Sequence, residues 1–463
     1  MTIWAPDLKG RDGPRYLAIA AALAEDVESG RLQPGTRLPT QRDLAFRLGL
    51  TTGTVGRAYA EAQRLGFLTG EVGRGTYIRD MGQRLSTLAR REVTPSDVVD
   101  VSLNYPPAAG GEEDAFREAL AAVSRSNDLT PLLSYQHDGA TPEQRVTAAA
   151  WLARAGLNVA PDEVVFTAGV QHGMTITLGA VCEPGDLVLA EALTYPGIRA
   201  LTIMQHLRLQ GIAIDENGIV PEAFETACRN GLVRALYTIP NLQNPTASIM
   251  PLERRLALVE IARRHDVILI EDDIYGFMLP NSPPRLATLA PERTVYLTST
   301  SKCLTPGLRV GFAVPPPDMV AKLGAMVRST LWMTAPPMIE IFRHLVESGA
   351  ADKIVNARNG EAAARQKIAA GALGDAEVRT DPTSPHLWLT LPERWQGRDF
   401  VHQARDRGVV VLGADDFALV HDAGRDHVRL CLGCPPRRSD LIQAMGILGD
   451  MLGGEPDLYR SFA

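Results

Sequence analysis

The chain has 463 residues, of which 45% are hydrophobic and 22% charged, enough apolar material for the cores of two or three domains. It has no run of 18 apolar residues, and no basic start followed by an apolar stretch, so neither a membrane span nor a secretory signal is expected. Five cysteines are too few for a disulfide framework, which favours a reducing compartment, and we expect a cytoplasmic protein.

The net charge of −7 is unevenly divided along the chain. Residues 1–92 carry 14 Lys and Arg against 10 Asp and Glu, a net charge of +4, which leaves −11 for the remainder. A basic N-terminal part followed by an acidic remainder is typical of a chain in which only the N-terminal part binds the phosphates of a nucleic acid. Random drift also produces a difference of this size, so the charge pattern needs support from motifs.

The first 80 residues alternate helix signals with turn signals. Residues 14–29 have apolar side chains at helical spacing. Two short helices are predicted over 41–49, with Thr40 as the N-cap, and over 51–66. Residues 67–78 then read as two short strands around glycines. This order predicts a helix-turn-helix followed by a β-wing.

A helix-turn-helix binds DNA by placing its second helix in the major groove. Here that helix opens with hydroxyl side chains, an arginine follows one turn later, and further arginines start the preceding helix and stand at the wing tip. Hydroxyls and arginines suit phosphates and base edges, although each arginine taken alone is more commonly solvated surface. The expected DNA contacts are Arg42, Thr51, Thr52, Thr54, Arg57 and Arg74.

The pattern changes after a polar stretch without periodicity. We predict a winged helix-turn-helix domain over 1–80, a linker over 81–98, and a second, α/β domain over 99–463. In the second domain short apolar runs alternate with helical stretches, which predicts buried parallel strands. These runs cover residues 164–169, 187–192, 233–240, 267–272, 294–299 and 309–314. Later strands near 386–391, 409–413 and 427–432, among helices, predict a smaller α+β lobe.

Most of the apolar runs end at residues that can do chemistry, and open α/β sheets bind ligands at the carboxyl ends of their strands. Lys302, Asp272 and Asn244 stand at such ends, and residues 169–171 can open a helix whose free N–H groups cup a phosphate. Pyridoxal 5′-phosphate (PLP) needs a lysine, an acid for its ring nitrogen, donors for its phenolic oxygen and an anion site. Each residue alone is commonly structural, and their joint occurrence predicts a PLP site.

Two groups of motifs resemble known families. G-x-L-x-P-G-x-x-L-P-x-x-R-x-L-A, T-V-x-x-A-Y and G-x-G-T, within residues 30–78, resemble the winged helix of GntR-type bacterial regulators. Gly53 departs from that family, which often has a larger polar residue there. The segments N-P-T, E-D-D-x-Y and S-K-x-L-x-P-G-L-R-x-G resemble the fold type I aminotransferase-like domain. Nearly the whole chain therefore resembles the MocR family of bacterial transcriptional regulators.

The resemblance implies a role for each matching residue. Lys302 would form an imine with PLP, and Asp272 would pair with the pyridine nitrogen. Arg429 would receive an effector carboxylate, a task that suits a bidentate guanidinium. His172 would line the effector pocket or simply pack. The remaining assignments are Asn244 and Tyr275 to the phenolic oxygen, Arg309, Ser299, Ser301, Gly169, Val170 and Gln171 to the phosphate, Tyr195 to the ring face, and Tyr135 to the phosphate site of the partner in a homodimer.

Some departures from the motifs are minor by the same reasoning. Ala247 replaces the glycine that commonly ends the N-P-T-G motif, which affects turn geometry rather than the cofactor. Cys303 is interpreted as a filler of the core. Cys431 and Cys434 form a single C-x-x-C without a second pair, so no metal site is expected.

Three functions are compatible with this combination. The first is a regulator that binds double-stranded DNA and senses an amino-acid-like effector by imine exchange at Lys302. The second is an active PLP-dependent aminotransferase with an autoregulatory DNA-binding domain. The third is a DNA-binding protein whose degenerate second domain only dimerises. A complete helix-turn-helix with a wing favours the first function, and intact Lys302, Asp272 and Arg309 count against the third.

Overall fold

The computed structural model describes residues 4–8, 14–28, 31–33, 36–64, 68–71, 75–78, 98–136, 139–420 and 423–456. The chain divides into two compact units, the head, Met1–Glu92, and the body, Val93–Ala463. Arg74 and, except for Val98, the predicted linker lie outside the described residues. Among the described residues, no helix combines the length and apolar composition that a bilayer span requires.

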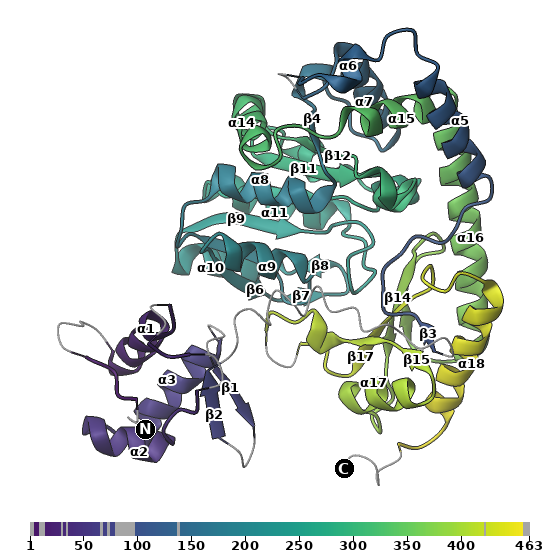
Figure 1. The fold of residues 1–463 in the computed structure, drawn as a ribbon. Helices are drawn as coiled ribbons and strands as arrows, with labels where there is room; N and C mark the ends of the chain where they lie inside the picture. The colour runs from purple at the N-terminus through teal and green to yellow at the C-terminus, as the bar shows by residue number, and fades with distance from the viewer. Residues whose placement is uncertain are drawn as a thin grey trace. The chain divides into compact units, whose positions relative to one another are not determined.

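The head is a helix-turn-helix followed by a two-stranded wing (Figure 1). Its strands pair antiparallel, with Leu68 opposite Ile78, and both residues are buried in the core of the head. The predicted order of elements is confirmed. The elements are α1 (Arg15–Glu28), α2 (Gln41–Leu48), α3 (Thr52–Arg64), β1 (Leu68–Glu71) and β2 (Gly75–Ile78).

Local hydrogen bonds define the turn between the two short helices of the head. Thr40 is the N-cap of α2, as predicted, because its hydroxyl accepts from the N–H of Asp43 at 3.1 Å. Gly49 ends α2 with φ of +64°, a left-handed conformation that favours glycine. The buried hydroxyl of Tyr59, on α3, donates to the carbonyl of Pro39 at 2.8 Å. This bond fixes the second helix against the entry to the first.

A seven-stranded sheet forms the centre of the body, in the order β4-β12-β11-β10-β9-β5-β6 (Figure 1). The strands run parallel except β12, which is antiparallel to both of its neighbours. Their bounds are β4 (Val165–Thr167), β5 (Leu187–Glu191), β6 (Arg208–Ile212), β9 (Val233–Thr238), β10 (Ile268–Asp272), β11 (Thr294–Ser299) and β12 (Gly311–Val314).

Two strands of this sheet differ from the sequence-based expectation. The apolar run 309–314 was expected to be a parallel strand, and this expectation is wrong for β12. The connection from Ser299 to Gly311 is too short for the crossover that parallel neighbours need, so the chain turns back antiparallel. The edge strand β6 was not predicted, because its exposed Arg208 and Gln210 interrupt the apolar signal.

Helices cover both faces of the sheet. Successive residues of β10 point to opposite faces, and Ile270 packs in one buried cluster with α8 and α14 while Leu269 packs in another with α10 and α11. These helices and their neighbours are α7 (Pro142–Arg154), α8 (Val170–Val181), α9 (Gly197–Met204), α10 (Pro221–Asn230), α11 (Leu252–Arg264), α12 (Leu286–Leu289), α13 (Thr300–Cys303) and α14 (Val320–Thr330).

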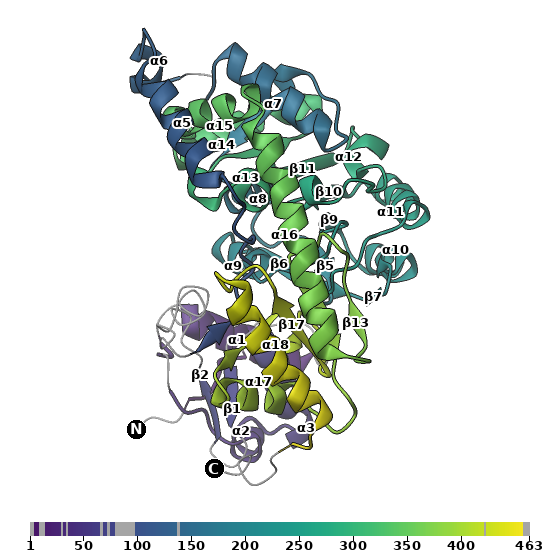
Figure 2. The ribbon, with the colours of Figure 1, turned by 90° about the vertical axis from the view of Figure 1, so that its right-hand side faces the viewer.

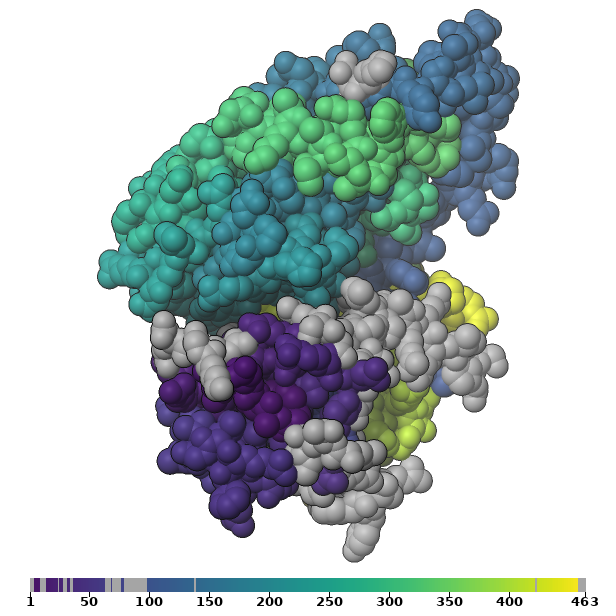
Figure 3. Space-filling model, turned by 60° about the vertical axis from the view of Figure 1, so that its left-hand side comes forward, coloured from purple at the N-terminus to yellow at the C-terminus, as the bar shows by residue number. Residues whose placement is uncertain are grey.

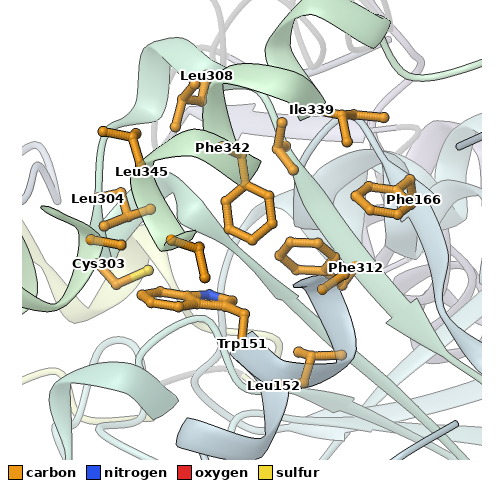
Figure 4. Packing of buried hydrophobic residues seen from close by; sticks show 14 of the residues in the cluster. Trp151, Leu152, Phe166, Cys303, Leu304, Leu308, Phe312, Ile339, Phe342 and Leu345 are labelled. Atoms are coloured by element: carbon orange, nitrogen blue, oxygen red, sulfur yellow. The ribbon is translucent and has the colours of Figure 1, made fainter. Parts of the chain in front are cut away.

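A further apolar cluster joins the end of the sheet to α7 and α15 (Pro336–Glu347) (Figure 4). Trp151 and Phe342 meet edge to face, with ring centroids 6.0 Å apart. Cys303 is fully buried in the same cluster, in agreement with the predicted filler role. On the body surface α5 (Glu112–Ser124) and α6 (Thr130–Leu133), in blue, lie beside the green α15 (Figure 3).

The smaller α+β lobe is confirmed. The long helix α16 (Ala350–Leu373) leads into it and packs along α18 (Arg438–Gly453) (Figure 2). Its four-stranded sheet has the order β13-β14-β17-β16, and β15 pairs separately with β3. The remaining elements are β3 (Val99–Asp100), β7 (Ile214–Asp215), β8 (Gly218–Ile219), β13 (Val378–Arg379), β14 (His386–Thr390), α17 (Gly397–Asp406), β15 (Val409–Val410), β16 (Leu412–Gly413) and β17 (His427–Cys431).

Candidate cofactor and effector site

Lys302 lies on α13, the short helix that follows β11 directly. Ser299 ends the strand and is fully buried, and its hydroxyl accepts from the N–H of Ser301 at 3.2 Å. The amine of Lys302 donates to the backbone carbonyl of Asn104. Burial lowers the pKa of Lys302 from 10.5 to about 8. A larger fraction of the amine is therefore uncharged near neutral pH, which is the form able to attack a carbonyl carbon.

Asp272 is the last residue of β10 and is buried. It lies on the same face of the sheet as Ile270, because alternate residues of a strand share a face. Its carboxylate accepts from the hydroxyl of Tyr237 at 2.7 Å and from the N–H of Ile274 at 3.2 Å. Burial nevertheless raises the pKa of Asp272 to about 7. A cationic N–H group of a ligand would stabilise the charged form of such a carboxyl, which burial disfavours.

Two sets of hydrogen bonds, one at Arg429 and one at Asn104, involve four of the predicted residues, which are Arg429, Asn244, Tyr275 and Lys302. Arg429 is buried on β17, and its Nη1 donates to Oδ1 of Asn244 at 2.6 Å. Its guanidinium lies over the ring of Phe417, with Cζ 4.6 Å from the centroid. Tyr275 accepts at its hydroxyl from Nδ2 of Asn104 at 2.6 Å. The segment around Asn104 therefore touches Lys302 and Tyr275 together.

Several residues predicted to bind the phosphate lie where α8 begins. Gly169 precedes the helix with φ of +87°, and the first N–H groups of α8 have no acceptor within the helix. Arg309, with φ of +52°, donates from Nη2 to the carbonyl of Ala168 at 2.8 Å. The positive φ favours glycine at position 169, and a Cβ atom there would lie 2.8 Å from Nη2 of Arg309, so that the guanidinium would have to move. An anion here would meet the helix N-terminus and a guanidinium together.

Tyr195 and Gln171 lie beside this anion site. The ring of Tyr195 packs on Gly197, where an added Cβ would stand 2.2 Å from Cε1. Burial raises the pKa of Tyr195, and the nearby charge of Asp272 raises it further, whereas those of Arg309 and Arg429 lower it. The Oε1 atom of Gln171 is buried and has no hydrogen-bond partner among the described residues.

The residues of the site fit PLP. The chain provides an amine with a lowered pKa, a buried carboxyl with a raised pKa and a close glycine–arginine contact at a helix N-terminus. Oε1 of Gln171 and Nε of Arg429 are buried polar atoms with no partner within the described part of the chain. Unpartnered buried polar groups are costly, so a ligand that satisfies them is favoured.

Two predicted residues take other roles within one subunit. His172 was predicted to line the effector pocket or to pack, and the structure favours packing. Its Nδ1 accepts from the N–H of Ala168 at 3.2 Å and its Nε2 lies 2.8 Å from the hydroxyl of Thr330, which leaves neither nitrogen for an effector. Tyr135 is 74% exposed and meets the ring of Trp332 at 5.5 Å. It is not brought to the site of its own subunit.

The head presents most of its predicted DNA-binding residues to solvent. Arg42, Thr51, Thr52 and Arg57 are exposed, and Thr54 is half-buried. The hydroxyl of Thr51 caps the start of α3 by accepting from the N–H of Thr54 at 3.2 Å. The guanidinium of Arg57 lies 5.1 Å from the ring centroid of Tyr16, on α1.

Comparison with known proteins agrees with both units. Residues 96–441, more than half of the chain, match the family aminotransferase class I and II. Residues 15–78 match the bacterial regulatory proteins of the gntR family. The chain belongs to the aminotransferase class I and II family and has the MocR architecture.

Relatives of this MocR-type chain include proteins named as HTH-type transcriptional regulators. It is 26% identical to the uncharacterized HTH-type transcriptional regulator YdeF of Bacillus subtilis, over 97% of this chain and 96% of YdeF. It is 27% identical to the HTH-type transcriptional regulator TauR of Rhodobacter capsulatus, over 87% of this chain and 89% of TauR.

Solved structures agree with the fold of the body. An archaeal alanine:glyoxylate aminotransferase matches with a TM-score of 0.71 and 23% identity, over 85% of this chain and 99% of that chain. The α-aminoadipate aminotransferase LysN of Thermus thermophilus matches with a TM-score of 0.70 and 23% identity, over 86% of this chain and 98% of LysN. At this identity the likeness shows the fold alone.

Several residues of the site in this MocR-type chain were not found from the sequence. Asn104 and Ser102 follow only a short strand and precede α5. Tyr237 is an interior residue of β9, and Phe417 directly follows a short helical turn that ends at Asp416. None of them stands directly after a long apolar run, which was the signal used. The turn-rich run L-N-Y-P-P around Asn104 was a weak signal for a polar residue in an irregular segment.

Proposed function

We propose that this MocR-type chain is a PLP-dependent transcriptional regulator. In this proposal the head binds double-stranded DNA and the body binds an amino-acid-like effector. One observation carries it: a complete helix-turn-helix with a wing is fused to a site in which Lys302 and Arg429 donate to the carbonyl groups of one segment, at Asn104 and Ser102, and in which Asp272 is a buried carboxyl with a raised pKa. The names of TauR and of PdxR of Corynebacterium glutamicum as HTH-type regulators support the same reading.

Each of the site residues would hold one part of PLP. Lys302 would bind it covalently through Nζ, and Asp272 would hold its ring nitrogen. Asn244 and Tyr275 would hold the phenolic oxygen, and Tyr195 would cover the ring. When bound, PLP supplies a carbonyl carbon at which the amine of Lys302 can be exchanged for the amine of an effector. The phosphate would be held by Gly169, Val170, Gln171, Ser299, Ser301 and Arg309.

Arg429 defines the other half of the effector. Its donors now bind the neutral oxygens of Asn244 and Ser102. A carboxylate accepts about twice as strongly as a neutral oxygen and takes two donors of a guanidinium at once. The effector is therefore a compound with a primary amine and a carboxylate. It changes DNA binding only if it binds two conformations of the chain with different affinities.

We also propose that the chain acts as a homodimer. Leu133, Tyr135 and Trp332 are 82%, 74% and 52% exposed, and they are large apolar side chains on the same surface of the body as α5 and α6. Exposed apolar side chains gathered in one place are typical of a protein interface. In such a dimer Tyr135 would reach the phosphate site of the partner, and two heads would meet two DNA half-sites.

The test of this function uses the full-length protein with PLP and a DNA duplex selected by it from a randomised pool. Amino acids, the matching amines without a carboxylate and 2-oxo acids are titrated, while cofactor absorbance and DNA affinity are recorded. An amino acid is expected to change both readings, and the matching amine to have a weaker effect. Fast amino transfer without any change in DNA affinity would instead support the aminotransferase, for which the Lys302 and Asp272 geometry is equally suited.

Replacement of Arg57 by alanine is expected to weaken binding of the selected duplex by about 1–3 kcal/mol if the side chain reads a base. If Arg57 instead contacts a phosphate, its replacement should reduce the slope of log affinity against log salt concentration by about 1. Cofactor absorbance should stay unchanged. Arg328→Ala, an exposed arginine of the body, is the matched control. Loss of both DNA and cofactor binding would point to misfolding, and unchanged DNA binding would contradict the assignment of Arg57.

A further inference from the structure

The first strand of the body continues into the cofactor site. The segment consists of residues 99–104, and we call it the entry strand. Its first part is fixed to the small lobe, because Val99 donates to the carbonyl of Gly408 at 2.8 Å and Val101 to that of Val410 at 2.9 Å. The entry strand is also the part of the site that is nearest to the head along the chain, so a movement of this strand can act on the chain that leads to the head.

Two carbonyl groups of the entry strand accept from the two residues proposed to bind the effector. Nη2 of Arg429 donates to the carbonyl of Ser102, and Nζ of Lys302 donates to that of Asn104. The Asn104 side chain adds a hydrogen bond to Tyr275 at 2.6 Å. The strand is thus bound once to the carboxylate-binding residue and once to the amine-bearing residue.

The donors of Arg429 show how an effector would compete with this strand. Nη1 is bound to Asn244, whereas Nε is buried and has no partner among the described residues. Nε and Nη2 point from the same edge of a guanidinium, the edge that takes a carboxylate through two parallel bonds. A carboxylate on that edge satisfies Nε and displaces the Ser102 carbonyl from Nη2, while the bond to Asn244 remains.

We propose that the entry strand is a two-position switch: with PLP on Lys302 and no effector it is held at Ser102 by Arg429, and with effector bound it is held at Asn104 by the released Lys302. This proposal rests on the proposed function. In the exchange the effector nitrogen forms its bond to the cofactor carbon and the bond of that carbon to Nζ breaks. The hydrogens that the effector nitrogen gives up end on Nζ, which is then free to donate to Asn104. One hydrogen bond is lost at Ser102 and another is gained two positions along the chain, at Asn104, which gives the strand two discrete arrangements.

Two reagents separate the two contacts in the full-length protein with PLP. Aminooxyacetate carries a nucleophilic nitrogen and a carboxylate, and O-methylhydroxylamine carries the same nitrogen without the carboxylate. Both take the cofactor carbon from Nζ, but only aminooxyacetate can bind the Nε and Nη2 edge. Amide hydrogen exchange of peptides covering residues 99–105 is measured with each reagent, and cofactor absorbance shows whether each has reacted.

Aminooxyacetate is expected to speed exchange at Val101 and Ser102 by about tenfold relative to O-methylhydroxylamine, the effect of losing one hydrogen bond to a charged donor. Arg429→Lys should make the two reagents alike, because a lysine lacks the two-donor edge. Arg437→Lys, at an exposed arginine paired with Asp440, should preserve the difference.

The outcomes distinguish a failure of the proposed switch from a failure of the proposed function. Equal exchange with both reagents in the wild-type chain, with absorbance showing that both have reacted, overturns the switch and leaves the proposed function intact. The same holds if the difference persists in Arg429→Lys, since the carboxylate then acts elsewhere. If neither reagent changes the absorbance, Lys302 does not carry the cofactor and both proposals fail.

Discussion

Lys302→Ala is expected to abolish the absorbance band of the lysine-bound cofactor and, with it, every response of DNA affinity to an effector. The amine of Lys302 is the nucleophile with a lowered pKa in the described site, and alanine has no atom that can form the covalent bond. The direct measurement is hydride reduction followed by peptide mass analysis. In the wild-type chain the reduced cofactor should be found on the peptide that contains Lys302.

The matched control for this change is Lys322→Ala, at an exposed lysine of α14. It should keep both the band and the modified peptide. Thermal unfolding of the two variants shows whether the chain is intact, and DNA binding without effector should persist in both, because the head forms its own core. A normal band in Lys302→Ala would refute the assignment of the lysine and, with it, the mode of sensing.

Asp272→Asn is expected to weaken PLP binding by about 3 kcal/mol, the lower range for leaving a buried charge without its partner. This corresponds to roughly a hundredfold in affinity. The amide keeps the shape of the side chain and can still accept from Tyr237, so the fold should survive. Equilibrium titration of the two proteins with PLP measures the difference, and Asp318→Asn, at an exposed carboxylate, is the control.

The pH dependence of this binding has a definite sign. Burial raises the pKa of Asp272 to about 7 when only protein groups surround it, whereas a cationic ring N–H would favour the charged carboxylate and lower that pKa. The bound form thus has the lower pKa, and affinity for PLP should fall as the pH drops below about 7. Asp272→Asn should lose this component. An unchanged pH profile in the variant would mean that Asp272 does not pair with the ring nitrogen.

The motif-bearing parts of the site could be predicted because their signal is local. Lys302, Asp272 and Asn244 each follow an apolar run, and strands that lie parallel bring their carboxyl ends to one edge of a sheet. Gly169 was predictable for a similar reason, since a glycine before a helix suits an anion site. Asn104 could not be found this way. It contacts Lys302, 198 positions away in the sequence, through its backbone carbonyl. Every residue type has such a carbonyl, so this contact cannot be predicted from the identity of the residue.

The direction of β12 and the surroundings of His172 also depend on the tertiary structure and not on local sequence. The apolar run 309–314 predicts a buried strand, but its direction depends on how far the chain can travel between two neighbours, which is a property of the assembled sheet. His172 has two alternatives in the sequence, and its contact with the hydroxyl of Thr330, a residue far along the chain, is visible only in the folded structure.

The sequence by itself determined the two units and the order of most strands and helices, and it indicated the lysine proposed to bind the cofactor, because these depend on periodicity and on short motifs. The tertiary structure alone decided what surrounds those residues. Burial lowers the pKa of Lys302 and raises that of Asp272, and both effects come from desolvation by parts of the chain distant in sequence. The tertiary fold also brought the entry strand to Arg429 and Lys302, since hydrogen bonds to backbone carbonyls are set by position in space and not by side-chain identity.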